Sequence, residues 1–352
     1  MTVYTTLMRM TSSKVGAGRA SWSRAASPAS AAASRTVATK GLDIGRSLQS
    51  PKCDMGKRRA SDRIAPLMAD RPSSTLCPSC GSLVGVNDEQ CLICGRRNPG
   101  MFGLTAALRG LGEDLGFLQI VMGGCGLLFL ASLVVTARLN PDALQQGGLF
   151  SFLSPSTPAL FLFGASGAIP VFGLGRWWTV LSAGWLHGGV IHIVFNMMSA
   201  RSLLPAMAHL YGPGRTVLLW TIGSVLGFVA SSTAGAFLPA IPFLRGAGLT
   251  IGASASIFGL IGALFHYGGQ ASPHIKEVAT RWAVSGALMG FFIPGIDNWA
   301  HFGGLAGGYL ASKWLNPFTP EQGNHVLAAM ACLVLSLLAV AASVITGLPL
   351  LR

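Results

Sequence analysis

The residues best suited to chemistry are a serine and a histidine in two separate apolar segments. Ser254 begins one segment, directly after Gly252 and Ala253, and His301 lies two segments further along the chain. Polar side chains at membrane depth are costly and are usually used or paired. A serine beside a histidine can act as nucleophile and general base in acyl transfer. The pair therefore predicts a hydrolytic site inside a bilayer.

A second polar pair, His192 and Asn196, lies in an earlier apolar segment. Residues four apart share one face of a helix, so both side chains can donate hydrogen bonds toward one point. Such donors suit an oxyanion. The alternative is a structural pair that holds two helices together. His187, nearer the outer end of the segment, is expected to cap the helix or contact the interface.

Four cysteines form a CxxC array repeated after ten residues: Cys77, Cys80, Cys91 and Cys94. This spacing predicts one tetrahedral zinc site. Two disulfides or a redox pair are the alternative. A module this short needs a metal to fold, and free thiols favour a reducing compartment, so this end is expected in the cytosol. The other cysteines are isolated and are expected to be inert: Cys53, Cys125 and Cys332.

Composition predicts a polytopic membrane protein. Of 352 residues, 51% are hydrophobic and only 11% charged, against about 25% charged in soluble domains. The net charge of +13 is concentrated in residues 1–67, which hold twelve of the 25 basic residues and three of the 12 acidic ones. The body of the protein is therefore not expected to bind nucleic acid.

Residues 1–67 lack any apolar period and are expected to be a disordered basic tail. An organelle transit peptide, a cytosolic arm touching anionic lipid and an untranslated stretch are the possible explanations, and the last two are favoured. In the third case the chain begins at Met68. No secretory signal peptide is expected.

Seven apolar spans are predicted: 117–137, 179–200, 215–237, 253–269, 281–294, 298–315 and 325–346. With the amino end inside, basic residues of the body are twice as frequent on the inner side as on the outer side, as the positive-inside rule requires. Ser254 and His301 then lie near the same, outer face. The loop 140–178 is apolar but interrupted by prolines, so it is expected to lie in the interface rather than span.

Small residues predict how these spans meet. The pairs Gly303/Gly307 and Gly304/Gly308 allow close packing, and Gly259 with Ala263 offers a matching register on the segment of Ser254. Asp297 is expected to cap the segment of His301. Two other serines are weaker candidates for the nucleophile. Ser166 lies in a GxSG sequence followed by a proline, and Ser256 faces another side of the helix.

Residues 117–317 resemble the rhomboid family of intramembrane serine proteases. The resemblance rests on four sequence pieces in family order: GRWWT from Gly175, HIVFN from His192, GASASIFG from Gly252 and NWAHFGG from Asn298. It implies an all-α polytopic fold with a six-helix bundle. The expected organisation is a tail (1–67), a zinc ribbon (68–100), a linker (101–116), the protease core (117–317) and an extra C-terminal transmembrane helix (318–352).

The resemblance also implies roles for single residues. Ser254 would be the nucleophile and His301 the base, in a dyad without a third carboxylate. His192, Asn196 and the amide of Ser254 would hold the oxyanion. Phe258 would stack on the His301 ring, and Gly252 would support the site. No cofactor is implied for the chemistry, and zinc is expected only in the ribbon.

The expected function is cleavage of transmembrane helices of other proteins within the bilayer. The alternative is a catalytically silent relative that binds membrane helices. A transporter would favour inverted repeats, and none is visible in the sequence. The ribbon is expected to dock an unknown partner or to be a passive cap. The expected location is a bacterial cytoplasmic membrane with the N-terminus in the cytosol, with an organelle membrane as the less favoured alternative.

Overall fold

The computed structural model describes residues 74–77, 79–85, 88–99, 114–139, 153–241, 244–293 and 295–351. The predicted tail, Cys53 and most of the predicted linker lie outside these residues. So do residues 140–152, the first part of the predicted interfacial loop.

Two short strands form the sheet of the cysteine-rich module. β1 (Ser74–Leu76) pairs antiparallel with β2 (Leu83–Gly85), and Thr75 lies opposite Val84. Cys77, Cys91 and Val84 are buried together and form a very small core. A core of this size cannot stabilise a module alone, which agrees with the expectation of a metal.

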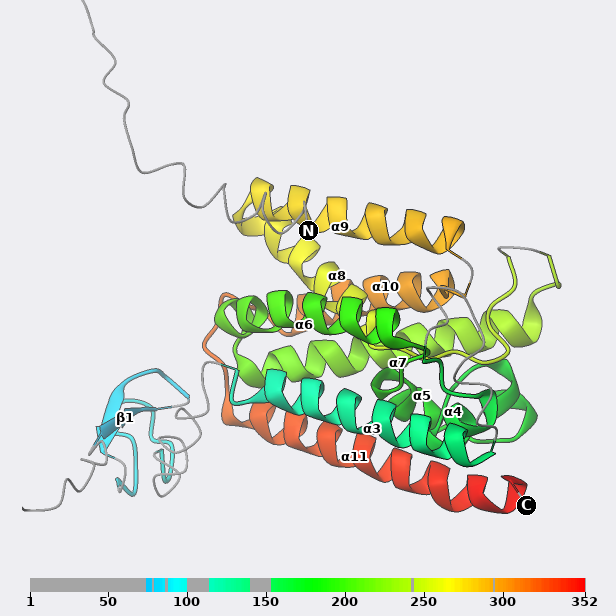
Figure 1. Ribbon diagram of the computed structural model, residues 1–352. Helices are drawn as coiled ribbons and strands as arrows, with labels where there is room; N and C mark the ends of the chain where they lie inside the picture. The colour runs from blue at the N-terminus through cyan, green and yellow to red at the C-terminus, as the bar shows by residue number, and fades with distance from the viewer. Residues whose placement is uncertain are drawn as a thin grey trace, which may run out of the picture. The chain divides into compact units, whose positions relative to one another are not determined.

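The remainder of the described chain is helical. Seven helices exceed fifteen residues: α3 (Phe117–Leu139), α6 (Val190–Tyr211), α7 (Pro213–Phe237), α8 (Ser254–Ala271), α9 (Pro273–Phe292), α10 (Asn298–Trp314) and α11 (Gly323–Gly347). The shorter elements are α4 (Thr157–Phe163), η4 (Ile169–Gly173), α5 (Thr179–Ser182), η5 (Ala183–Trp185) and η6 (Leu348–Leu351). The long helices run alongside one another in Figure 1.

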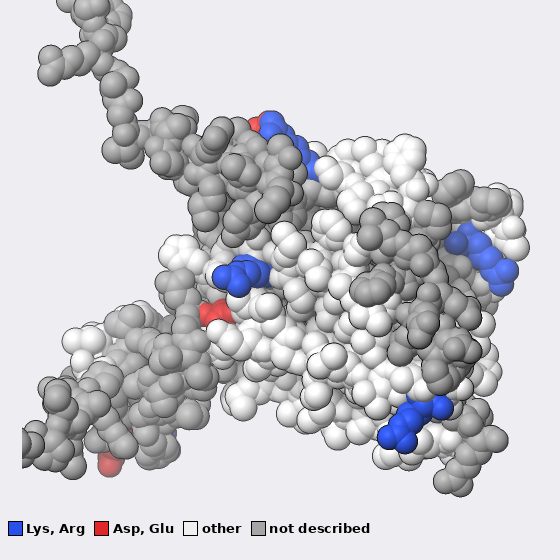
Figure 2. Space-filling view, in the orientation of Figure 1, with Lys and Arg blue, Asp and Glu red and all other residues white. Residues whose placement is uncertain are grey.

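Four of these helices, α3, α6, α7 and α11, are long and apolar enough to cross a membrane. In Figure 2 the visible Lys and Arg side chains lie toward the ends of the helices, and the surface between them is largely uncharged. An uncharged belt of this kind suits the hydrocarbon core of a bilayer. The protein is therefore a multi-pass membrane protein.

The second predicted span was wrong at both ends. It was expected over 179–200, but the long helix α6 covers Val190–Tyr211. The chain before it forms the short α5 and η5 and then turns extended at Leu186, which breaks the helix. At the other end α6 continues through Pro205 and stops at Gly212. The φ of Gly212 is +89°, a conformation that favours glycine. The next residue, Pro213, begins α7.

The fifth predicted span began too late. It was expected over 281–294, whereas α9 covers Pro273–Phe292. Ser272 is its N-cap, its side chain accepts a hydrogen bond from the backbone N of Ile275, and Pro273 occupies the first turn. The extra two turns carry charged side chains, and for this reason hydropathy alone did not include them.

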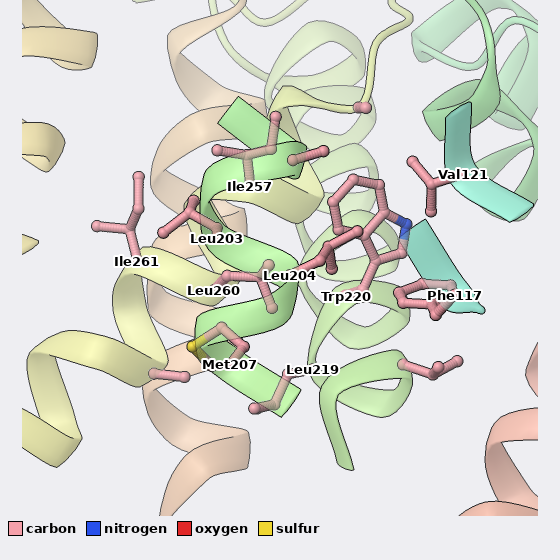
Figure 3. Packing of buried hydrophobic residues seen from close by; sticks show 14 of the residues in the cluster. Phe117, Val121, Leu203, Leu204, Met207, Leu219, Trp220, Ile257, Leu260 and Ile261 are labelled. Atoms are coloured by element: carbon pink, nitrogen blue, oxygen red, sulfur yellow. The ribbon is translucent and has the colours of Figure 1, made fainter. Parts of the chain in front are cut away.

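Large apolar side chains fill the space between α3, α6, α7 and α8. Figure 3 shows Phe117 and Val121 of α3 facing Trp220 of α7, with Leu204 of α6 beside them. The Phe117 and Trp220 rings meet edge to face, with centroids 5.9 Å apart. This cluster fixes the helices that carry His192 and Ser254.

Helix α11 is tied to the rest of the bundle by two buried arginines. Arg215 of α7 donates hydrogen bonds to the backbone carbonyls of Asn316, Thr319 and Pro320, in the connection between α10 and α11. Arg176 donates to the backbone carbonyl of Ser343 of α11 at 2.8 Å. A helix predicted as an addition thus shares buried polar contacts with the other helices.

Candidate functional site

The four cysteine sulfurs of the N-terminal module lie within 4.8 Å of one another. The sulfurs of Cys77 and Cys94 are 3.6 Å apart, as are those of Cys80 and Cys91. Four sulfurs placed tetrahedrally around a zinc ion at about 2.3 Å would be about 3.8 Å apart. All four cysteines are free thiols. The cluster could therefore hold a metal ion of zinc's size.

The two CxxC turns repeat the same backbone pattern. Gly81 donates its amide to the carbonyl of Cys77, and Gly95 donates to the carbonyl of Cys91, at 2.8 and 2.9 Å. Both glycines have φ near +75°, in the left-handed region that favours glycine. The Ser82 hydroxyl, 3.0 Å from the Cys80 sulfur, lowers the pKa of that thiol to about 6.

Ser254 is the first residue of α8 and is partly exposed. The segment before it is fixed by backbone hydrogen bonds. Gly252 donates its amide to the carbonyl of Ala183, and Thr250 and Ser166 exchange two backbone hydrogen bonds at 2.7 and 3.0 Å. Free amides at a helix start favour negative charge, so this position suits a group that gains negative charge in a reaction.

Gly252 brings the backbone close to His192. Its φ is +123°, and a Cβ placed there would lie 2.7 Å from His192 Nε2 and 3.7 Å from Ser254 Oγ. A side chain at this position would displace the His192 ring. Gly252 therefore lies close to both His192 and Ser254, so three of the predicted site residues are neighbours.

The hydrogen bonds of His192 define which ring nitrogen can donate. The Gly188 amide donates to His192 Nδ1 at 3.3 Å, so the proton of the neutral ring resides on Nε2. This is the nitrogen beside Gly252. Asn196 is buried, and its side-chain amide donates to the His192 carbonyl at 3.0 Å, which leaves one amide hydrogen for another acceptor.

His301 lies buried on α10 against the ring of Phe258. The ring centroids are 4.1 Å apart and the planes are within 10° of parallel. Phe258 is one turn after Ser254 on the same face of α8. The stack therefore holds the imidazole beside the turn of α8 that begins with Ser254. His301 Nδ1 is buried and has no hydrogen-bond partner among the described residues.

Asp297 is the N-cap of α10, as predicted. Its carboxylate accepts from the backbone N of Ala300 and from the hydroxyl of Ser231 on α7. Both of its oxygens are thereby engaged away from the imidazole, so the orientation of His301 depends on the Phe258 stack rather than on a carboxylate.

Close helix contacts bring α10 against α8 and α7. A Cβ at Gly304 would strike the carbonyl of Ala255, and one at Gly308 would strike the carbonyl of Gly259. Gly303 and Gly307 instead face Leu226 of α7. The predicted contact between the Gly304/Gly308 pair and Gly259 is thus present. On α8 the second close approach is made by Gly262, against the backbone of Leu305 and Tyr309.

The two weaker serine candidates lie in other surroundings. Ser256 is fully buried, and its hydroxyl has no partner among the described residues. Ser166 is also fully buried, 3.3 Å from the Thr179 hydroxyl. His187, expected at an interface or cap, is instead 1% exposed and lies edge-on to His192, with ring centroids 5.1 Å apart.

The segment around Ser166 has a structural role that its GxSG sequence did not indicate. Ala168 and Ile169 donate backbone hydrogen bonds to Ala247 and Gly248, in addition to the Ser166–Thr250 bonds. This segment therefore holds the chain that leads to Ser254. Gly164 and Gly167, both with positive φ, turn the chain on either side of this segment.

Comparisons with known proteins agree with this arrangement. Residues 174–317 match the rhomboid domain. The chain is 30% identical over 188 residues to rhomboid protease GluP of Bacillus subtilis, covering 52% of this chain and 35% of GluP. It is 32% identical over 201 residues to RHOMBOID-like protein 4 of Arabidopsis thaliana, covering 51% of this chain and 48% of that protein.

A further match is to the B. subtilis protein YdcA, which is 30% identical over 143 residues and of which the chain covers 67%. The match covers 39% of this chain. The chain thus spans about a third to a half of the first two relatives and two thirds of YdcA. On these matches and the helical architecture, the protein belongs to the rhomboid family.

Proposed function

We propose that the protein is an intramembrane serine endopeptidase that cleaves transmembrane helices of other membrane proteins. The observation that carries the proposal is the stack of His301 on Phe258, one turn from Ser254. It supports a histidine base held against the start of the helix that carries a partly exposed serine. The names of the relatives, several of which are rhomboid proteases, point to the same chemistry.

In the proposed reaction, Ser254 Oγ attacks the scissile carbonyl carbon while His301 Nε2 accepts the hydroxyl proton. The imidazolium then returns this proton to the leaving amine, and water hydrolyses the acyl-enzyme by the same route. The two side chains form no hydrogen bond with each other in the described structure, so their closure on substrate binding is part of the proposal.

The oxyanion that forms in this reaction would lie between donors from two helices. His192 Nε2 carries the ring proton and lies beside Gly252, and the backbone N–H of Ser254 is at the start of α8. Asn196 would contribute its remaining amide hydrogen. Donors that are fixed before the reaction stabilise the developing charge without reorganisation.

The proposed organisation keeps residues 117–317 as the protease core and 318–352 as an added helix. Helices α8, α9 and α10 would complete the membrane-spanning set together with α3, α6, α7 and α11. Counting basic residues at the helix ends favours a cytosolic N-terminus, with Ser254 toward the outer face. A bacterial cytoplasmic membrane is the proposed location.

The ribbon, residues 68–100, would hold one structural zinc ion through Cys77, Cys80, Cys91 and Cys94. The sulfur separations and the two matched turns support this. Zinc would supply folding free energy to a module with little core of its own. We propose that the folded ribbon docks a cytosolic partner.

The test is cleavage of a model transmembrane substrate by the purified full-length protein in detergent. Wild type is compared with Ser254→Ala, and Ser166→Ala serves as the matched control because that serine is fully buried. Cleavage lost only in Ser254→Ala supports the proposal. Cleavage that persists in Ser254→Ala excludes this serine as the nucleophile. Binding of the helix without cleavage by wild type would favour a silent helix-binding relative.

A further inference from the structure

A cavity of about 290 Å³ opens between the far ends of α8, α9 and α10. Seven residues line it: Phe265, His266, Gly269, Gln270, Lys276, Tyr309 and Lys313. Gln270 is about 24 Å along α8 from Ser254, at 1.5 Å per residue. The cavity therefore belongs to the opposite end of the helices from the proposed active site and shares no residue with it.

The cavity carries unbalanced positive charge. Lys276 and Lys313 both line it, and no acidic residue does. The nearest carboxylate in the sequence, Glu277, forms an ion pair with Arg281 one turn later on α9. Neither lysine forms an ion pair with any residue that the structure describes. Two such ammonium groups at one opening favour an anionic ligand.

Aromatic rings hold both lysines at the cavity wall. The Lys276 ammonium lies 5.1 Å from the centroid of the Phe265 ring, and the Lys313 ammonium lies 4.6 Å from that of Tyr309. Gly268 allows this arrangement, because a Cβ there would strike the backbone of Lys276 at the start of α9. The wall thus combines apolar ring faces with two exposed cationic side chains that lie over them.

This combination matches the chemistry of a phospholipid headgroup. Lysine binds phosphate as a point charge, and basic pockets between transmembrane helices bind anionic headgroups. The cavity lies where α8 and α10 end and α9 begins. With α8, α9 and α10 spanning the bilayer as proposed above, this level would coincide with the phosphates of one leaflet. We propose that it binds the phosphate of an anionic phospholipid, with the acyl chains along the apolar faces of the helices.

The first experiment measures binding of phosphatidylglycerol to the full-length protein by native mass spectrometry, after release from nanodiscs of phosphatidylglycerol and phosphatidylcholine. Lys276→Gln and Lys313→Gln should each weaken binding about fivefold, the usual effect of one lysine near an anionic lipid surface. Arg201→Gln is the charge-matched control, since Arg201 is exposed on α6 and does not line the cavity. It should bind as wild type does.

A second variant tests the cavity without changing charge. Gly269 lines the cavity, and a Cβ there would meet no heavy atom within 4 Å. Gly269→Leu should therefore fill the space and weaken phosphatidylglycerol binding, with the melting temperature in phosphatidylcholine unchanged. Equal binding by wild type and all cavity variants, or equal weakening in Arg201→Gln, would overturn the proposal.

A competition experiment distinguishes a phospholipid from free inorganic phosphate as the ligand. Inorganic phosphate is added to the protein in detergent, with and without phosphatidylglycerol. We expect only the lipid to raise the melting temperature, and phosphate not to displace it. A rise with inorganic phosphate alone that is lost in Lys313→Gln would overturn the lipid assignment in favour of a soluble phosphate. These experiments measure lipid binding and melting temperature, so a failure of the protein to cleave a substrate would not affect their interpretation.

Discussion

Phe258 and His301 form a nearly parallel ring stack, with centroids 4.1 Å apart, between two different helices. In many serine hydrolases a carboxylate orients the histidine by accepting a hydrogen bond from Nδ1. Among the described residues no such partner reaches His301 Nδ1, and the stack instead holds the ring by its face. Here the nearby Asp297 is engaged by Ala300 and Ser231. Packing between α8 and α10, rather than an ion pair, therefore fixes the ring.

Replacing Phe258 with leucine should reduce activity more than stability. Leucine keeps an apolar side chain but removes the ring face, so the orientation of His301 is relaxed. An aromatic stack of this kind contributes about 1 kcal/mol, which predicts a roughly fivefold fall in kcat. The measurement is kcat and KM on a transmembrane substrate, with exposed Phe195→Leu on α6 as the control. Unchanged kcat in Phe258→Leu would show that the stack does not position the base.

Replacing Gly252 with alanine should abolish most activity. The added Cβ would press on His192 Nε2, and the φ of +123° strains any residue with a side chain. A displacement of this size at a catalytic constellation costs about a hundredfold. Gly295→Ala is the matched control, because Gly295 also has a positive φ but its Cβ would meet nothing within 4 Å. Similar activity in the two variants would contradict the role given to Gly252.

Replacing Gly308 with alanine should separate α10 from α8. The new methyl group would strike the backbone carbonyl of Gly259, which cannot move aside like a flexible side chain. Overpacking of this kind costs about 1–3 kcal/mol, visible as a lower melting temperature in detergent. Gly123→Ala on α3, where a Cβ meets no heavy atom within 4 Å, should melt as wild type does. Equal melting temperatures for both variants would refute the close contact.

Removal of the metal should unfold the ribbon. We expect about one zinc ion per chain by elemental analysis and almost none in Cys91→Ser, whereas Cys332→Ser on α11 retains it. Chelation should accelerate hydrogen exchange at the amides of Gly81 and Gly95, which form the turn hydrogen bonds. A purified protein without zinc whose ribbon amides are still protected would contradict a metal-dependent fold.

Sequence patterns predicted the helices well where hydropathy and helix signals coincide. The bounds of α3, α7, α10 and α11 agree within a few residues with the predicted spans. The start of α6 was missed because residues 179–186 (TVLSAGWL) are mostly apolar and lie just before the helix. Hydropathy does not distinguish a buried irregular turn from a span. The start of α9 was missed because its first turns are charged.

The residue types of the candidate site could be selected from the sequence, but its supporting contacts could not. The spacing of His192 and Asn196 and the glycines of α10 indicated which faces meet, because helix periodicity determines them. Hydrogen bonds join Ser166 to Thr250 and Arg176 to Ser343, and the members of each pair are far apart in the sequence. No local pattern encodes such pairings, so they became visible only in the fold.

The central claim is that Ser254 is a nucleophile activated by His301. The most direct measurement is labelling of the full-length protein in detergent with a fluorophosphonate, followed by peptide mass mapping of the adduct. We expect one adduct, on Ser254, whose rate of formation falls at least about a hundredfold in His301→Ala. An adduct on another serine, or labelling of Ser254 at an equal rate without His301, would contradict it.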